Sequence, residues 1–483
     1  MILLITCIIF LFSCSTNNGE VQNDTISADI NTQPVVTETQ TGSKIEAVNL
    51  GGKEFVILDR QVEGLYTYSL AQFTAVEENG NIINDVVYQR NLLVEEKFNI
   101  KIVPVDKYYA SGKNEIIKMC NSGEDIYATV ATSLINCFSL ALGGYLQDIK
   151  SIPYIDLNQP WWMGSMLSDT SIADKNYFAS GDMNMASFNT CGAVYFNKKL
   201  QQDYILENPY TLVKDNNWTM DKFAEMSKGI TEDINGDGIF GLDDKYGFSC
   251  NSFVWQPLFY GTDSLMIKKD ASELPYFNPL DERTYNVVLK IINFLNNKET
   301  TITVNQIKGV TDFGGAASKI FVEGRALFWI ELIYGTNQLR DMEDDYGIIP
   351  TPKYDETQRD YTTYLHPNHS SAMGIPITNN GTPNTGMILE DMAYFSNVLI
   401  RPAFYDVTLK TKYARDAESA EMLDIIYKNI KIDLAIIMRE DGIDIDQLMR
   451  DACNVNNTNV VAKFEANADK YNSIIEKAVE AFK

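Results

Sequence analysis

The stretch Phe55-Val-Ile-Leu-Asp-Arg-Gln61 is a short apolar run with a polar end, and it predicts a buried β-strand. Apolar residues at helical spacing among charges predict a helix over 84–98, and alternation over 99–105 predicts a second strand. A third strand is predicted at 125–130. Strand, helix and strand at this spacing indicate βαβ units and a mainly parallel sheet.

A second block of strands and helices begins after Phe178. Strands are predicted at 192–196, 326–330 and 347–349, and helices at 219–230 and 282–296. The last third, 385–483, is expected to be mostly helical, with one long amphipathic helix marked by Met422, Ile425, Ile426, Ile430, Leu434 and Ile437. A chain of 483 residues is too long for a single core, so two α/β lobes are predicted.

The N-terminal segment has the features of an export signal. Met1 to Ser13 is apolar, shorter than the about 20 residues that span a bilayer, and it stops at Cys14. Leu11-Phe-Ser-Cys14 resembles the bacterial lipoprotein box, in which the Cys becomes the lipidated first residue. We therefore expect a signal peptide at 1–14, a flexible tether at 15–43, and a lipid-anchored protein on the extracellular face of the cell membrane. Because no Lys or Arg precedes the apolar run, a soluble protein with an accidental Cys is the competing interpretation.

Charge and cysteine usage exclude several classes of protein. The net charge of −25 argues against nucleic acid as a partner, because phosphate binding needs a surplus of Lys and Arg on some face. The cysteines beyond the leader are widely spaced and form no CxxC pair, which argues against a disulfide framework or a zinc site; they are Cys120, Cys137, Cys191, Cys250 and Cys453.

The segment 233–244 has the spacing of a calcium loop. Oxygen ligands at positions 1, 3, 5 and 12, a backbone carbonyl at 7 and a Gly at 6 are typical of EF-hand loops. The corresponding candidates are Asp233, Asn235, Asp237, Asp244 and Ile239, with Gly238 at the bend. Since position 12 is Asp rather than Glu, a turn that needs no metal is the alternative. A single structural Ca2+ is the only cofactor that we predict.

No catalytic motif is present in the chain. We find no GxSxG, HExxH, P-loop or GxGxxG pattern, so the protein is predicted not to be an enzyme. The only two histidines, His366 and His369, lack an acidic third ligand at metal spacing and make a weak metal motif. The aromatic side chains suit sugar rings as well as cores, and Trp255 and Trp329 are better site candidates than Trp218.

Most of the chain from Lys44 to Lys483 resembles the family 1 extracellular solute-binding proteins, the lipoprotein receptors of ABC importers, which include maltodextrin-binding protein. The matching segments occur in the family's order and are Tyr195–Leu200, Pro209–Leu212, Asn217–Phe223, Ile230–Gly238, Lys245–Phe248, Phe321–Phe328, Asp345–Pro352 and Arg401–Asp406. The resemblance implies a two-lobe type II periplasmic-binding-protein fold that closes over a ligand in the cleft. It places lobe one at 44–187 with 365–410, and lobe two at 188–364 with 411–483.

Ligand-binding residues are predicted from the ends of the strands and from the family resemblance. Open parallel sheets bind ligands beyond the carboxyl ends of their strands, which points to Arg60 and Gln61, to Ser133, and to the segment Glu331–Tyr334. The resemblance adds Thr190 beside Asn189 at the hinge, Trp255 and Tyr334 as cleft aromatics, and Ser370-Ser371 at the return into lobe one. We expect Trp255 and Tyr334 to stack on the solute, and Arg60 and Glu331 to hydrogen-bond it from opposite lobes.

The resemblance implies a receptor that hands its solute to the permease of an ABC importer. An oligosaccharide suits both the family and the aromatic side chains. The competing function is an extracellular carbohydrate-active enzyme or a calcium-dependent, wall-associated binding module, because the calcium loop and the aromatics would suit either.

Overall fold

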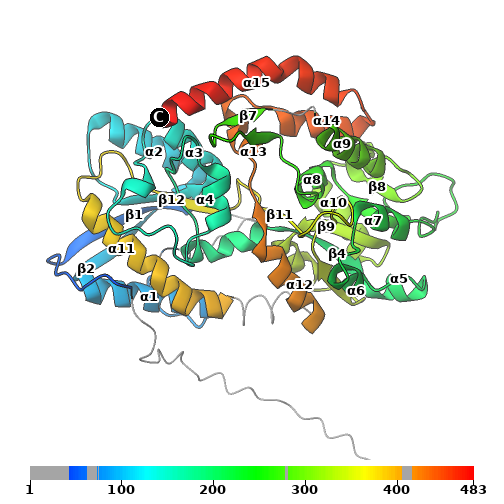
Figure 1. The fold of residues 1–483 in the computed structure, drawn as a ribbon. Coiled ribbons are helices and arrows are strands. Elements are labelled where there is room, and N and C mark those ends of the chain that lie inside the picture. The colour runs from blue at the N-terminus through cyan, green and yellow to red at the C-terminus, as the bar shows by residue number, and fades with distance from the viewer. Residues whose placement is uncertain (1–42, 62–72, 74, 278–280, 405–415) are drawn as a thin grey trace, which may run out of the picture. The chain divides into compact units, whose positions relative to one another are not determined.

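The first sheet is built from strands that lie far apart in the sequence. The computed structural model describes residues 43–61, 73, 75–277, 281–404 and 416–483, so the leader, Cys14 and nearly all of the tether lie outside the described residues. The sheet has the order β12-β3-β1-β2 (Figure 1). β1 (Lys53–Gln61) runs parallel to β2 (Ile100–Tyr108) and β3 (Thr129–Ser133), while β12 (Ser371–Gly374) is antiparallel to β3. The predicted parallel pairing is thus confirmed for the first two strands.

The helix between β1 and β2 begins and ends as its sequence dictates. α1 (Ile82–Phe98) starts after Asn81, whose side chain accepts the N–H groups of Ile83 and Asn84, and it ends at Asn99 with φ 45°. Its buried face includes Val94 and Phe98. The strand predicted at 125–130 is displaced, because β3 begins only at Thr129. Residues 124–128, just before it, are not in a strand.

The second sheet has the order β10-β4-β9-β5-β8. Its strands are β4 (Gly192–Asn197), β5 (Tyr246–Cys250), β8 (Thr301–Thr303), β9 (Ala326–Leu332) and β10 (Tyr346–Ile349). β5 runs parallel to β8 and β9, whereas β4 is antiparallel to both β9 and β10. The second sheet is therefore mixed, because β4 lies between β9 and β10 and is antiparallel to both.

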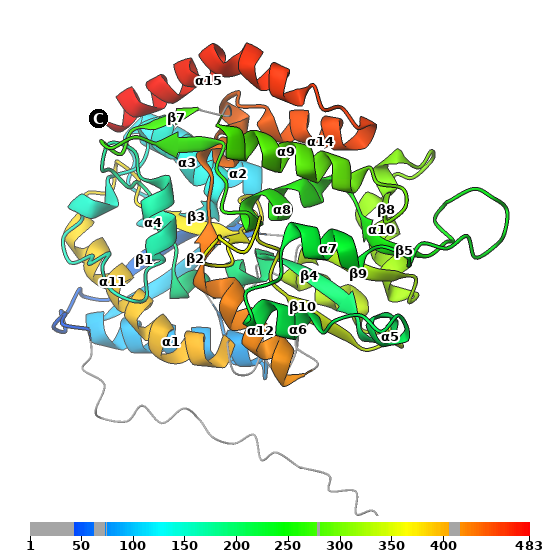
Figure 2. The same ribbon diagram turned by 45° about the vertical axis from the view of Figure 1, so that its right-hand side comes forward.

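Helices cover both sheets (Figures 1 and 2). Those that follow α1 in the first half are α2 (Tyr109–Ser122), α3 (Leu134–Leu142) and α4 (Gly164–Thr170). Those of the second half are α5 (Lys198–Asp203), α6 (Pro209–Lys214), α7 (Met220–Met226), α8 (Trp255–Gly261), α9 (Glu282–Leu295) and α10 (Phe313–Val322). The C-terminal helices are α11 (Thr382–Phe395), α12 (Ala417–Lys428), α13 (Leu434–Ile437), α14 (Ile445–Val455) and α15 (Val460–Phe482). The last third is thus mostly helical, as predicted.

The prediction of a single long helix around 422–437 is wrong. α12 stops at Lys428, and β13 (Ile430–Lys431) pairs in parallel with β11 (Thr363–Tyr364). The Asp433 side chain then accepts the N–H of Ala435 at the start of α13. The pairing of β13 with β11, a strand distant in the sequence, therefore outweighs the helical period of the sequence here.

The last helix contacts elements of both halves. The ring of Phe482 lies 5.6 Å from that of Phe138 in α3, and Tyr471 lies 4.8 Å from Phe277 in β7 (Pro275–Phe277), which pairs with β6 (Ile267–Lys269). Figures 1 and 2 both show α15 crossing the top of the structure. The predicted lobe boundaries stay a prediction.

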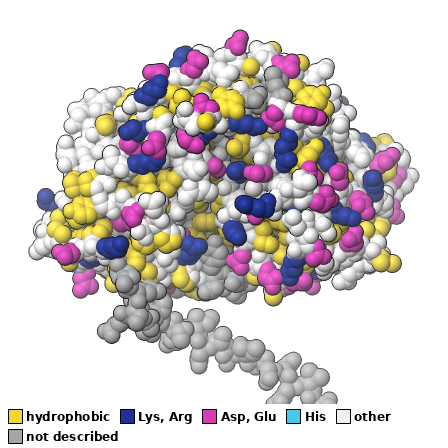
Figure 3. All heavy atoms as spheres, in the orientation of Figure 1, with side chains coloured by type: hydrophobic (Ala, Val, Ile, Leu, Met, Phe, Trp, Pro, Cys, Tyr) yellow, Lys and Arg dark blue, Asp and Glu magenta, His cyan; other side chains and the backbone are white. Residues whose placement is uncertain are grey.

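Three surface and covalent features bear on the sequence analysis. Within the described ranges, no helix is both long and apolar enough to cross a bilayer. The cysteines Cys120, Cys137, Cys191, Cys250 and Cys453 are free thiols. Lys and Arg side chains are scattered among Asp and Glu on the face shown in Figure 3, with no basic stripe.

Candidate functional site

A cavity of about 400 Å³ opens beside the carboxyl end of β9. It is bounded by the start of α8, by the end of β9 and the turn after it, by the segment that leads from β11 toward β12, and by the turn after α13. The lining residues are Asn251, Phe253, Val254, Gln256, Pro257, Gly314, Ile330, Glu331, Leu332, Tyr334, Tyr364, His366, Asn368, His369 and Arg439. The site therefore lies at a strand end, where open α/β sheets bind ligands.

Aromatic and polar groups line this cavity together. Phe253 is 47% exposed, and its ring lies 4.8 Å from the guanidinium carbon of Arg450. Tyr334 is partly exposed, with its ring 6.2 Å from that of His369. The buried Oδ1 atom of Asn368 has no hydrogen-bond partner within the part of the chain that the structure describes. Apolar faces with a few placed polar atoms are the usual composition of a small-molecule site.

Two histidines stack in the cavity wall. The rings of His366 and His369 are 3.9 Å apart with an interplanar angle of 12°. Nδ1 of His366 accepts the backbone N–H groups of Asn368 and His369, each at 3.3 Å, so the neutral ring carries its proton on Nε2. Burial, the adjacent imidazole and Arg439 hold the pKa of His366 well below its usual range. Burial, Arg60 and Arg439 lower the pKa of His369 to about 3, so both rings are uncharged at neutral pH.

A buried carboxylate organises the floor beside Arg439. Asp446 accepts hydrogen bonds from Nε1 of Trp255 at 3.1 Å and from Nε2 of Gln256 at 2.8 Å, and it forms an ion pair with Arg450. Nη1 of Arg439 lies 3.9 Å from the same carboxylate. The Gln256 side chain also accepts the hydroxyl of Tyr364 at 2.6 Å. These contacts hold α8, α14 and β11 together next to the cavity.

Glu331 carries the one carboxyl group among the lining residues that the structure describes. Its Oε1 atom accepts the backbone N–H of Leu332 at 2.9 Å. Burial raises its pKa to about 7, so the group exchanges a proton near neutral pH. It can accept hydrogen bonds from a ligand when ionised and donate one when protonated.

The predicted ligand-binding residues fall into distinct groups. Glu331 and Tyr334 line the cavity, in line with the strand-end argument. Arg60 does not line it, but Nη1 donates to the carbonyl of Ser370 at 3.5 Å, and its charge lowers the pKa of both imidazoles. Gln61 closes β1, and its side chain lies outside the described residues.

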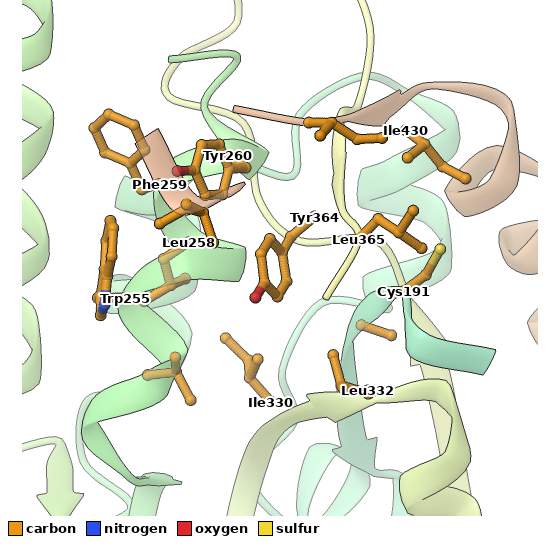
Figure 4. Close-up of a cluster of buried hydrophobic side chains, with 14 of the residues drawn as sticks. Cys191, Trp255, Leu258, Phe259, Tyr260, Ile330, Leu332, Tyr364, Leu365 and Ile430 are labelled. Carbon is orange, nitrogen blue, oxygen red and sulfur yellow. The ribbon is translucent and has the colours of Figure 1, made fainter. Parts of the chain in front are cut away.

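Three other candidates are buried structural residues. The Ser133 hydroxyl accepts the N–H of Asn136 and caps α3, and the Thr190 hydroxyl donates to the carbonyl of Ser187 at 2.6 Å. Trp255 is 0% exposed and does not line the cavity. Figure 4 shows it on α8 in one apolar cluster with Leu258, Phe259 and Tyr260. The structure thus contradicts the expected stacking role of Trp255, because its indole faces Asp446 and the core.

The sequence analysis missed several cavity residues, namely Phe253, His366, Asn368, His369 and Arg439. The two histidines were not predicted as ligand-binding residues, although their place just before the return into lobe one could have marked them. Phe253 is two residues from the aromatic chosen instead, at the turn before the same helix. Arg439 carries no signal in its own segment.

The 233–244 loop is ordered by its own side chains. Asp233 accepts the N–H groups of Gly236 at 2.7 Å and Gly238 at 2.8 Å, and buried Asp244 accepts those of Ile234 and Gly241. Asn235 and Asp237 each accept the N–H two residues further on, and that of Asp237 comes from Ile239. No three His, Cys, Asp or Glu side chains in the described ranges are grouped as metal ligands. The residues favour a calcium-type turn, and calcium binding stays a prediction.

Comparison with known proteins identifies the fold. No family model and no curated protein matches the chain. Among solved structures, the ABC substrate-binding protein Lmo0181 of Listeria monocytogenes, in complex with cycloalternan, matches with a TM-score of 0.54 and 10% identity, over 87% of this chain and 99% of its own. UspC of M. tuberculosis matches with a TM-score of 0.57 and 11% identity, over 87% and 100%. A solute-binding protein of Thermotoga lettingae, bound with α-D-tagatose, matches with a TM-score of 0.53 and 13% identity, over 88% and 100%.

These matches cover nearly the full length of each known structure. The chain therefore has the two-lobe α/β fold of ABC solute-binding proteins. The fold predicted from the family 1 resemblance is confirmed.

Proposed function

We propose that this chain, with the fold of an ABC solute-binding protein, is a receptor that binds a sugar in the cavity beside β9. The observation that carries the proposal is the composition of that cavity. Exposed Phe253 and half-buried Tyr334 offer ring faces to a sugar, while Glu331, Asn368 and the imidazoles supply polar atoms. Two of the matching structures hold sugars, which supports this ligand class.

The mechanism is binding without chemical change. Glu331 and Tyr334 belong to β9 and the turn after it, whereas His366 and His369 lie on the segment that leads into β12 of the other sheet. A solute that contacts both sets is bound best in one arrangement of the lobes. It shifts the conformational equilibrium by its differential affinity for that arrangement.

A thermal-shift screen tests the receptor proposal. The full chain would be heated with mono- and oligosaccharides and, as the comparison class, short peptides. A bound solute stabilises the native state by RT ln(1 + [L]/Kd), which is about 2.7 kcal/mol at a hundredfold excess over Kd. A rise in melting temperature with a sugar supports the proposal, and a rise with peptides alone would contradict it.

We further propose that Cys14 is lipidated and that the receptor delivers its solute to an ABC permease. The apolar run ending at Cys14 and the polar segment after it support the anchor. Cells labelled with a fatty-acid probe should label the wild type, and Cys14→Ser should lose the label. Ser13→Ala, next to it, is the matched control. Equal labelling of wild type and Cys14→Ser would rule out the anchor.

A structural Ca2+ in the 233–244 loop completes the proposal. The ligand set would be the side chains of Asp233, Asn235, Asp237 and Asp244 and the carbonyl of Ile239. The loop lies outside the cavity, so calcium would stabilise the second lobe rather than contact the sugar.

A further inference from the structure

Two arginines lie at or beside the cavity of a protein whose net charge is −25. Arg439 lines it from the turn after α13, and Arg60 approaches from the end of β1, where Nη1 donates to the carbonyl of Ser370. The charges of both guanidinium groups act on both His366 and His369. Two arginines that are far apart in the sequence thus place positive charge near the same pair of imidazoles.

The carboxylate nearest to Arg439, that of Asp446, already has several other partners. Asp446 accepts from Trp255 and Gln256, is paired with Arg450, and forms a longer ion pair with Arg439 at 3.9 Å. Among the described residues, the strongest influences on the pKa of either imidazole are burial and cationic or imidazole neighbours, and no carboxylate is among them. Glu331 is the one carboxyl in the described lining, and its pKa of about 7 leaves a large share protonated at neutral pH.

His366 and Arg439 offer hydrogen-bond donors to the cavity, next to the acceptor Oδ1 of Asn368. Because Nδ1 of His366 accepts two backbone N–H groups, its Nε2–H is left as a donor. The guanidinium of Arg439 is a donor only, with the planar fork that suits anionic oxygens. Donors with a positive potential select an anion over a neutral hydroxyl.

We propose that the solute is an acidic saccharide, a sugar bearing a carboxylate, sulfate or phosphate group, and that this group lies against Arg439 and His366. Phe253 and Tyr334, which also line the cavity, then contact the sugar rings. This inference rests on the proposed sugar-receptor function and names the class of sugar.

Calorimetric titration of the full chain with matched saccharides tests this inference. Uronic-acid, sulfated and phosphorylated oligosaccharides are each compared with the uncharged sugar of the same length and linkage, which also identifies the acidic group. We expect at least one acidic member to bind about tenfold to a hundredfold more tightly than its neutral counterpart. Its affinity should fall between about 50 mM and 500 mM NaCl, whereas neutral binding should not change.

Arg439→Gln supplies the residue-level test. It should weaken binding of the acidic sugar by about tenfold to a hundredfold more than it weakens binding of the neutral sugar of the same length. Arg359→Gln, at a side chain that is 92% exposed and outside the cavity, is the matched control and should change neither. If Arg439→Gln does not fold, the salt dependence of the wild type decides.

The outcomes separate the two proposals. Equal affinity for the acidic and neutral members, without salt dependence, would overturn the acidic class and leave the sugar receptor standing. Failure of every saccharide to bind would overturn the receptor and the acidic class together.

Discussion

Nε1 of Trp255 donates to Oδ1 of Asp446 at 3.1 Å, at a point where neither side chain is open to the cavity. This bond joins α8 to α14 and fixes the segment that presents Phe253 to the cavity. Trp255, which the sequence predicted to contact the ligand, thus lies in the core next to the cavity wall and holds that wall in place. Its role is structural, and its substitution should be detected in stability.

Trp255→Ala should lower the free energy of unfolding by about 3–5 kcal/mol, because it removes a fully buried indole and leaves a cavity. Trp255→Phe keeps most of the volume but loses the bond to Asp446, and should cost about 1–3 kcal/mol. Urea denaturation measures both. An unchanged unfolding free energy together with lost sugar binding would return Trp255 to the ligand site.

Tyr334→Ala should show the opposite behaviour. The side chain lines the cavity and is partly exposed, so its loss should weaken sugar binding by about 1–3 kcal/mol, or about tenfold to a hundredfold in Kd. The melting temperature should stay near that of the wild type. Tyr285→Ala, at an exposed tyrosine of α9 outside the cavity, is the control for both measurements. A collapsed melting transition without a specific binding defect would place Tyr334 in the core.

The titration of Glu331 should appear in the pH dependence of stability. Its carboxyl ionises near pH 4.5 in the unfolded chain and near 7 in the native state, so between these values the unfolded state binds fewer protons. The contribution of this group to stability therefore falls as the pH rises from about 4.5 to about 7. Glu331→Gln cannot ionise and should gain in melting temperature relative to the wild type across this window. Parallel curves for the two proteins would contradict the raised pKa.

How much of this could be predicted from the sequence depends on the range of the interactions. The β1, α1 and β2 segments follow from local period and from the Asn81 cap, and all three are near their predicted positions. The break between α12 and α13 depends on β13 pairing with β11, which no local pattern encodes. The amphipathic period at 422–437 therefore could not predict that the helix breaks there.

The site divides in the same way. Glu331 and Tyr334 could be found because a strand end predicts them. His366 and His369 were visible only as a weak metal motif, since their low pKa values come from burial and from Arg60 and Arg439, which lie far away in the chain. Such residues are identified by their three-dimensional surroundings and not by spacing.

Calcium should stabilise the protein through the 233–244 loop. If the ion is bound, EDTA should lower the melting temperature and added calcium should restore it, by about 2.7 kcal/mol of stability at a hundredfold excess over Kd. Asp237→Ala should abolish the response by removing one ligand. Asp243→Ala, in the same exposed loop but outside the ligand set, should retain it. Wild-type melting that is indifferent to chelation would leave only the turn held by Asp233 and Asp244.

The most direct test of the account is a crystal structure of the protein with a saccharide that raises its melting temperature. We predict electron density for the sugar in the cavity beside β9, with a ring against Phe253 or Tyr334 and a polar group within hydrogen-bond distance of His366 or Arg439. Density for the sugar at any other place, with this cavity filled only by water, would contradict the assignment.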